Sequence, residues 1–87
     1  MIKLNEMVRK TAIDGEMVLL DAKSGAYYGL NEVGSRMVEL ALQLSDNETI
    51  IKTITEEFDA EESLIRDDFA ELMDTLLKKE LIVDREA

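Results

Sequence analysis

Residues 14–31, DGEMVLLDAKSGAYYGLN, decide the fold because they contain two turn signals with a strand on either side of each. Asp14-Gly15 is typical of a two-residue hairpin turn, in which both central residues adopt positive φ. Lys23-Ser24-Gly25 predicts a three-residue hairpin loop with its glycine in the left-handed region. We therefore expect three antiparallel strands, at about 4–13, 16–21 and 26–30.

The apolar residues that follow recur with a helical period. Asn31 is a good cap for the first helix. The second helix is predicted to begin at a cap formed by Asn47 or Thr49. The third is predicted to begin at Asp59, with Glu62 three residues later as in a capping box. We expect helices at about 32–44, 48–58 and 60–79.

The order of these elements predicts the fold class. A three-stranded antiparallel sheet followed by three helices is an α+β arrangement in which one face of the sheet receives the helices. The short connection between the second and third helices indicates helix-turn-helix geometry. Residues 81–83 favour a short final strand. A chain of 87 residues is expected to form one domain, residues 1–87.

The composition argues against several classes of function. The chain has no Cys and no His, so it lacks the usual thiol nucleophile, zinc ligands and general base, and we expect no catalytic residue, metal or cofactor. The 20 acidic and 10 basic residues give a net charge of −10, which disfavours nucleic acid and anionic membrane surfaces. No apolar run approaches the roughly 18 residues of a membrane span. Residues 1–6 lack the apolar core of a signal peptide, so a cytoplasmic location is expected.

The pattern of residues 14–31 resembles the PqqD-like family of recognition elements. The resemblance continues through Glu32-Val33-Gly34 and, later in the chain, through residues 68–72, Leu76 and Leu81-Ile82. It is strongest for the stand-alone recognition proteins of lasso-peptide biosynthesis and extends from about residue 4 to about residue 83. One departure is Glu80, where such domains often carry Gly near the end of the last helix.

The resemblance implies a winged helix-turn-helix fold that binds a peptide rather than DNA. In this family the leader of a ribosomally synthesised precursor peptide adds as an antiparallel strand to the third strand and lies against the third helix. The resemblance also implies that the protein itself is not an enzyme. The implied partners are the precursor leader, a leader peptidase of the transglutaminase-like cysteine protease type, and a lasso cyclase.

The third strand and the third helix supply the candidate binding residues. An edge strand offers unpaired backbone groups, and alternate side chains select the ligand. Gly29 allows a second backbone to come close. On the helix, apolar residues suit an aromatic or proline side chain, and acidic residues suit a polar or basic group. The predicted peptide-binding residues are Ala26, Tyr27, Tyr28, Gly29, Leu30, Asp68, Phe69, Glu71, Leu72, Thr75 and Leu76.

Each of these residues also has a simpler interpretation. Tyr27 and Tyr28 fit ordinary strand aromatics that pack across a sheet. Leu30, Phe69 and Leu72 fit a hydrophobic core. The acidic residues of the last helix fit a solvated surface.

Three other functions compete with peptide recognition. A winged-helix DNA-binding regulator is disfavoured because residues 59–75 carry seven acidic residues against a lone Arg66, which phosphates would repel. An enzyme is disfavoured because no nucleophile and base form a recognisable pair. A generic protein–protein adaptor remains open, and selective binding of a leader would distinguish the two.

Overall fold

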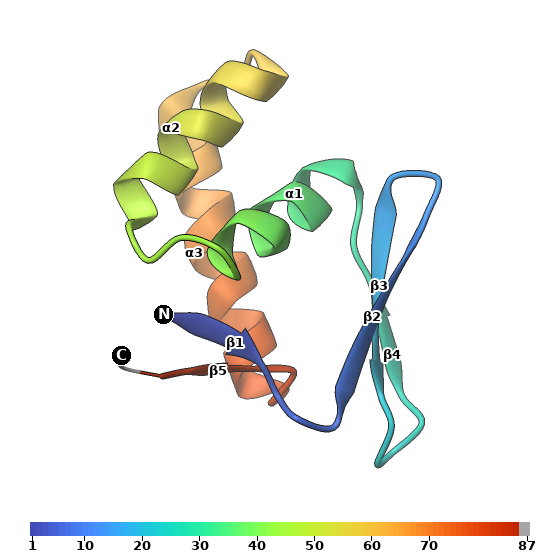
Figure 1. The fold of residues 1–87 in the computed structure, drawn as a ribbon. Helices are drawn as coiled ribbons and strands as arrows, with labels where there is room; N and C mark the ends of the chain where they lie inside the picture. Colours follow the sequence, from blue (N-terminus) through green and yellow to red (C-terminus); the bar gives the residue numbers. More distant parts are fainter. Residues whose placement is uncertain (86–87) are drawn as a thin grey trace.

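The computed structural model describes residues 1–85. The strands are β1 (Ile2–Leu4), β2 (Val8–Ile13), β3 (Glu16–Asp21), β4 (Tyr27–Gly29) and β5 (Ile82–Asp84). The helices are α1 (Glu32–Ala41), α2 (Asn47–Phe58) and α3 (Glu62–Lys78). β2, β3 and β4 form an antiparallel sheet with β3 in the centre, and β1 pairs with β5 in a separate ribbon. The helices lie on one side of the three-stranded sheet (Figure 1), so the predicted α+β winged helix-turn-helix class is confirmed.

Both predicted turn glycines are confirmed by their backbone angles, but the second loop spans residues 22–26 and not the predicted three residues. Asp14 and Gly15 have φ of 53° and 81°, as the two-residue turn requires. Gly25 has φ of 77° in the loop between β3 and β4. These turns hold the three strands in register and leave β4 at one edge of the sheet.

The prediction of one strand over residues 4–13 is wrong, because Asn5 breaks it into β1 and β2. The Asn5 side-chain oxygen accepts a hydrogen bond from the Met7 N–H at 3.2 Å, and its carbonyl accepts one from the Val8 N–H at 2.9 Å. Asn stabilises turns through such local bonds. Its side-chain nitrogen donates to the Glu80 carbonyl at 2.9 Å, which ties the turn to the end of α3. The predicted final strand is present as β5, one residue further along the chain, and pairs with β1.

The start of α1 agrees with the prediction and its end does not. The Asn31 side chain accepts a hydrogen bond from the Gly34 N–H at 2.8 Å, which confirms the predicted cap. The helix ends at Ala41 rather than at residue 44. The Gln43 N–H donates to the Leu40 carbonyl at 3.0 Å, three residues back, so the last turn tightens and stops.

The predicted caps of α2 and α3 are both wrong. Asp46 caps α2, because its carboxylate accepts hydrogen bonds from the Glu48 N–H and the Thr49 hydroxyl. The Thr49 hydrogen bond lowers the pKa of Asp46 below its ordinary value. Asp59 ends α2 in the left-handed conformation, with φ of 49°, instead of beginning α3. Aspartate tolerates that conformation better than most residues. α3 begins later, at Glu62, after a cap residue that makes no side-chain hydrogen bond.

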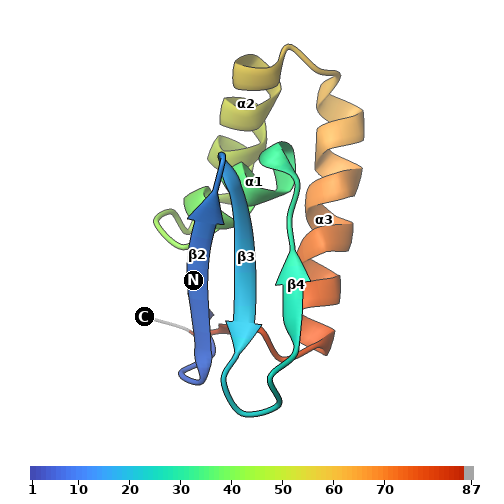
Figure 2. The ribbon, with the colours of Figure 1, turned by 90° about the vertical axis from the view of Figure 1, so that its right-hand side faces the viewer.

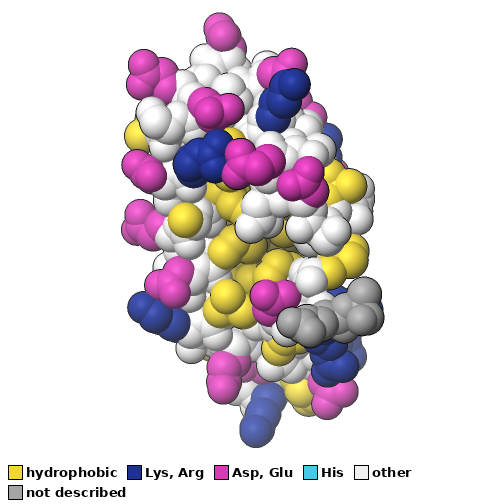
Figure 3. Space-filling model, turned by 90° about the vertical axis from the view of Figure 1, so that its left-hand side faces the viewer, with side chains coloured by type: hydrophobic (Ala, Val, Ile, Leu, Met, Phe, Trp, Pro, Cys, Tyr) yellow, Lys and Arg dark blue, Asp and Glu magenta, His cyan; other side chains and the backbone are white. Residues whose placement is uncertain are grey.

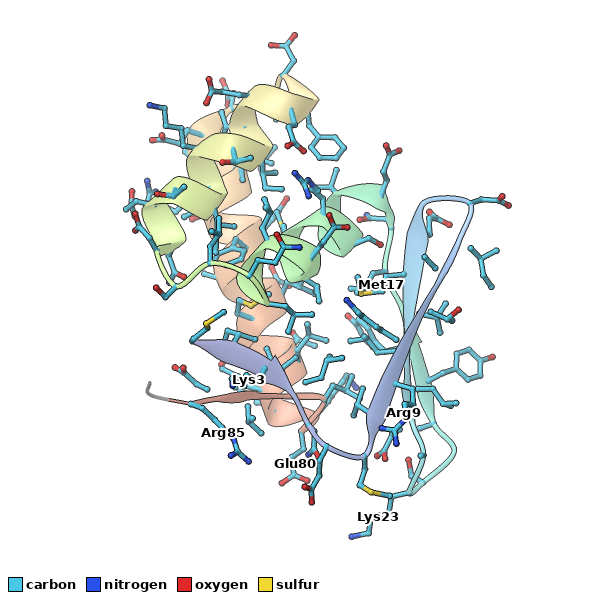
Figure 4. The ribbon with its side chains drawn as sticks, viewed as in Figure 1. Lys3, Arg9, Met17, Lys23, Glu80 and Arg85 are labelled. Atoms are coloured by element: carbon cyan, nitrogen blue, oxygen red, sulfur yellow. The ribbon has the colours of Figure 1, made fainter. Side chains whose placement is uncertain are left out.

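Glu80 occupies the position that favours glycine after α3. Its φ is 59°, and the N–H groups of Glu80 and Leu81 donate to the carbonyls of Leu77 and Leu76. This is a Schellman ending, whose left-handed residue is usually Gly. Figure 4 shows Glu80 at the lower end of the molecule, in the turn that leads to β5. Glu80 therefore forms the left-handed turn that a glycine would usually form at this position.

Two apolar clusters make up the core. The first joins the sheet to α3 and β5, with Leu19 and Leu76 fully buried. The second lies among the three helices around Ile54, which is also fully buried. Leu72 packs against both clusters, so α3 connects the sheet to the helical layer.

Two ion pairs join the helices at the surface. Arg36 of α1 donates to both carboxylate oxygens of Glu57 at 2.8 and 2.9 Å, and Arg66 of α3 donates to both of Glu48 at 2.6 and 2.9 Å. These bonds lower the pKa of Glu57 and of Glu48 below their ordinary value. Over residues 1–85 no helix has the length and apolar character needed to cross a membrane.

Candidate functional site

The free edge of β4 presents the backbone groups of alternate residues. The Asp21 N–H donates to the Ala26 carbonyl, and the Leu30 N–H donates to the Met17 carbonyl, both at 2.8 Å. Hydrogen-bonded residues alternate along an antiparallel pair, so Tyr28, opposite Leu19, also bonds toward β3. The N–H and C=O groups of Tyr27 and Gly29 therefore point away from the sheet and are available to a further strand.

The side chains of β4 alternate between two faces. Tyr27 points to the outer face and is 76% exposed. Tyr28 is half-buried and packs against the core, and Leu30 is buried. A side-chain carbon built at Gly29 would meet no atom within 4 Å, so the space beside this residue is open. The inner face of β4 thus meets the helices, and its edge stays uncovered.

A groove of about 530 Å³ runs between this edge and α3. Figure 2 shows β4 and α3 next to each other. The groove brings together seven of the predicted residues: Tyr28, Gly29, Leu30, Asp68, Glu71, Leu72 and Thr75. The groove therefore combines three things: the free backbone edge of β4, an apolar floor that includes Leu30 and Leu72, and a wall on α3 that carries Asp68 and Glu71.

Four predicted residues lie elsewhere. Phe69 is 4% exposed and Leu76 is fully buried, so both belong to the core and not to the groove. They lie seven residues apart on the helix stripe that faces inward. Ala26 and Tyr27 do not line the groove either, although Tyr27 offers its backbone at the β4 edge.

The sequence prediction missed six residues that line the groove: Asn31, Val33, Gly34, Met37, Leu64 and Ile65. Three of them lie in the first turns of α1 and a fourth, Asn31, is the cap of that helix. Leu64 is 57% exposed and lies outside the inward-facing stripe of α3 that contains Phe69 and Leu76. A leucine that does not fit the helical period of the buried stripe is the sequence signal that would have identified it. A side-chain carbon at Gly34 would lie 3.2 Å from the Asn31 Oδ1 and 3.7 Å from Leu72, so the glycine keeps this end of the groove open.

Acidic side chains line the α3 wall of the groove, and a basic side chain lies beside it near Tyr28. Asp68 and Glu71 are exposed on its α3 wall, and neither forms an ion pair within residues 1–85. The Lys79 Nζ lies 5.9 Å from the centre of the Tyr28 ring, within the range of a cation–π contact. The carboxylates thus lie nearer the start of α3, and the ammonium lies at its end.

Between Met1 and Arg85 no group of three acidic side chains is arranged to hold a metal ion. A second hollow of about 260 Å³, lined by Met1, Leu44, Met73 and Leu77 among others, lies on the face away from the three-stranded sheet. Figure 3 shows apolar side chains gathered there, with acidic residues around them. It contains none of the predicted residues, so the groove beside β4 is the candidate site.

Comparison with known proteins gives one family and two solved structures. The family model described as "Coenzyme PQQ synthesis protein D (PqqD)" matches residues 16–82, which is most of the chain. No curated protein matches the sequence.

Both structures are complexes with a peptide. TbiB1 in complex with the TbiA(beta) leader peptide is 30% identical, with a TM-score of 0.83, and the match covers 98% of this chain and 99% of that one. A lasso peptide synthetase B1 complexed with the leader peptide is 25% identical, with a TM-score of 0.86, covering 95% and 98% of the two chains. The similarity therefore extends over nearly the whole chain, including the sheet and the three helices.

Proposed function

The chain belongs to the PqqD family, and from this premise we propose that it is a non-catalytic element that binds the leader of a ribosomally synthesised precursor peptide. The two similar structures, both with leader peptides, support a lasso-peptide precursor as the ligand. The observation that carries the proposal is the free edge of β4 beside an open groove of about 530 Å³.

The leader adds to β4 as an antiparallel strand. Its backbone bonds to the N–H and C=O groups of Tyr27 and Gly29, which supply affinity without reading sequence. Alternate leader side chains enter the groove, where Leu30 and Leu72 offer apolar contact. The other leader side chains point to the outer face of the sheet beside Tyr27.

The bound leader is then delivered to two enzymes, a leader peptidase and a lasso cyclase. The absence of His and Cys from the sequence supports this division of labour, because the chain has neither the commonest general base nor a thiol nucleophile. The chain increases the local concentration of the precursor at these enzymes.

A titration tests the proposal. A fluorescent leader peptide, encoded by the precursor gene that neighbours the gene for this chain, is titrated with the folded protein, and anisotropy is recorded. We expect saturable binding of the leader and none of the core peptide. No binding by a protein with native circular dichroism would instead favour a generic adaptor.

A further inference from the structure

Asp68 and Glu71 on the groove wall form no ion pair within residues 1–85, because the basic residues of α3 pair with other carboxylates. Arg66 donates to Glu48 and lies 3.6 Å from Glu62, and Lys78 pairs with Asp74 at 2.9 Å. Neither cation turns toward Asp68 or Glu71. The acidic wall is therefore left free to meet a cation that comes from outside the chain.

The direction of a bound strand follows from the fold. In Figure 2, β4 runs toward α1, whereas α3 runs the opposite way. A strand antiparallel to β4 thus runs in the same direction as α3. It passes Asp68 and Glu71 first and reaches Tyr28 and Lys79 later.

The spacing of the charges fits alternate residues of such a strand. The midpoint between Asp68 and Glu71 is separated from Lys79 by about 14 Å along the helix axis, at 1.5 Å per residue. Four residues of an extended strand cover about 13 Å. Residues four apart in a strand point to the same face, so both can enter the groove. The residue halfway between them comes level with Leu72 and Thr75.

We propose that the groove selects segments in which a basic residue is followed two residues later by an apolar residue and four residues later by an acidic one. This inference rests on the proposed function, which it deepens by naming the chemistry of the ligand. The basic residue meets Asp68 and Glu71, and the acidic residue meets Lys79. Because reversing the segment would bring like charges together, the same arrangement fixes the direction of binding.

A displayed library of random linear peptides tests the selection directly. The library is panned separately on the immobilised parent protein and on the Gly29→Pro variant. Only peptides that bind the parent and not the variant are counted, because these need the intact β4 edge. We expect them to be enriched in the basic–apolar–acidic pattern at the stated spacing. Asp68→Lys with Glu71→Lys should remove the preference for the basic residue, and Lys79→Glu should remove the preference for the acidic one.

Asp67→Lys is the matched control, because Asp67 is an exposed neighbour that does not line the groove. For one selected peptide, we expect the groove reversals to weaken binding about two- to fivefold per charge and the control to leave it unchanged. Groove-dependent peptides without a charge order would overturn this inference and leave the proposed function standing. A library without any peptide that depends on the β4 edge would overturn both.

Discussion

The hydroxyl oxygen of Ser35 accepts a hydrogen bond from the backbone N–H of Met17 at 2.7 Å. The same hydroxyl donates to the Leu30 carbonyl at 3.3 Å. Met17 and Leu30 are opposite residues at the end of the β3–β4 pair, and the Leu30 N–H donates to the Met17 carbonyl. Ser35 is 6% exposed. Its buried hydroxyl, which comes from α1, therefore supplies the last hydrogen bonds at this end of the β3–β4 pair.

Replacing this hydroxyl should destabilise the protein. Ser35→Ala leaves the Met17 N–H buried without a partner, so we expect the free energy of unfolding to fall by about 1–3 kcal/mol. Ser45→Ala, at an exposed position, is the control and should change it by less than about 0.5 kcal/mol. Urea unfolding of the two variants measures the difference. Equal midpoints would show that the hydroxyl does not stabilise the ladder.

Replacing Glu80, the left-handed residue after α3, with glycine should stabilise the protein. Glu80→Gly removes the steric cost of φ at 59°, so the free energy of unfolding should rise by up to about 1 kcal/mol. Glu80→Ala removes the same carboxylate and keeps the strain, so it should not stabilise. If both variants were equally stabilised in urea, loss of charge and not backbone strain would be the cause.

The β4 edge can be tested with one position and two substitutions. Gly29→Pro removes an N–H that points away from β3, so the sheet should stay paired while leader binding weakens about tenfold or more. Gly29→Ala keeps the N–H, and its added carbon meets no atom within 4 Å, so it should bind nearly as the parent does. Tyr28→Pro would be a poorer test because it removes a bond to β3. Normal leader binding by a folded Gly29→Pro would argue against strand addition here.

The interhelical ion pairs predict how stability depends on pH. The hydrogen bond from Arg36 lowers the pKa of Glu57, and the one from Arg66 lowers the pKa of Glu48. A carboxylate with a lowered folded pKa stabilises the folded state fully above its ordinary value of 4.5, and this stabilisation is lost as pH falls through the lower folded value. Urea midpoints should thus decline below about pH 4.5.

Two variants separate these pairs from general acid effects. Glu57→Gln should be less stable than the parent at neutral pH and should lose part of the decline in acid. Glu56→Gln changes a neighbouring carboxylate that has no ion pair within the described residues, so it should follow the parent curve. A Glu57→Gln curve parallel to that of the parent would mean that this pair does not contribute.

The local features were predictable from the sequence, and the long-range ones were not. The turns at Asp14-Gly15 and Gly25 and the cap at Asn31 depend on a few adjacent residues. The pairing of β1 with β5 joins segments from the two ends of the chain, which no local pattern reveals. Asp59 was misassigned because aspartate suits both the start of a helix and a left-handed ending.

The groove was partly predictable for a related reason. The helical period identifies the buried stripe of α3, which includes Phe69 and Leu76, but it does not say which flank of that stripe faces β4. Asp68, Glu71 and Thr75 lie on that flank. The floor from α1 could not be predicted, because it depends on how α1 packs against α3 and the sheet.

Amide hydrogen exchange, followed by NMR with and without saturating leader peptide, tests strand addition most directly. The fold predicts that the Tyr27 and Gly29 amides exchange freely in the unbound protein and become protected in the complex. The Tyr28 amide, which bonds toward β3, should be protected in both states. Unchanged exchange at Tyr27 and Gly29 on saturation with leader would contradict the account, because the peptide would then bind without pairing to β4.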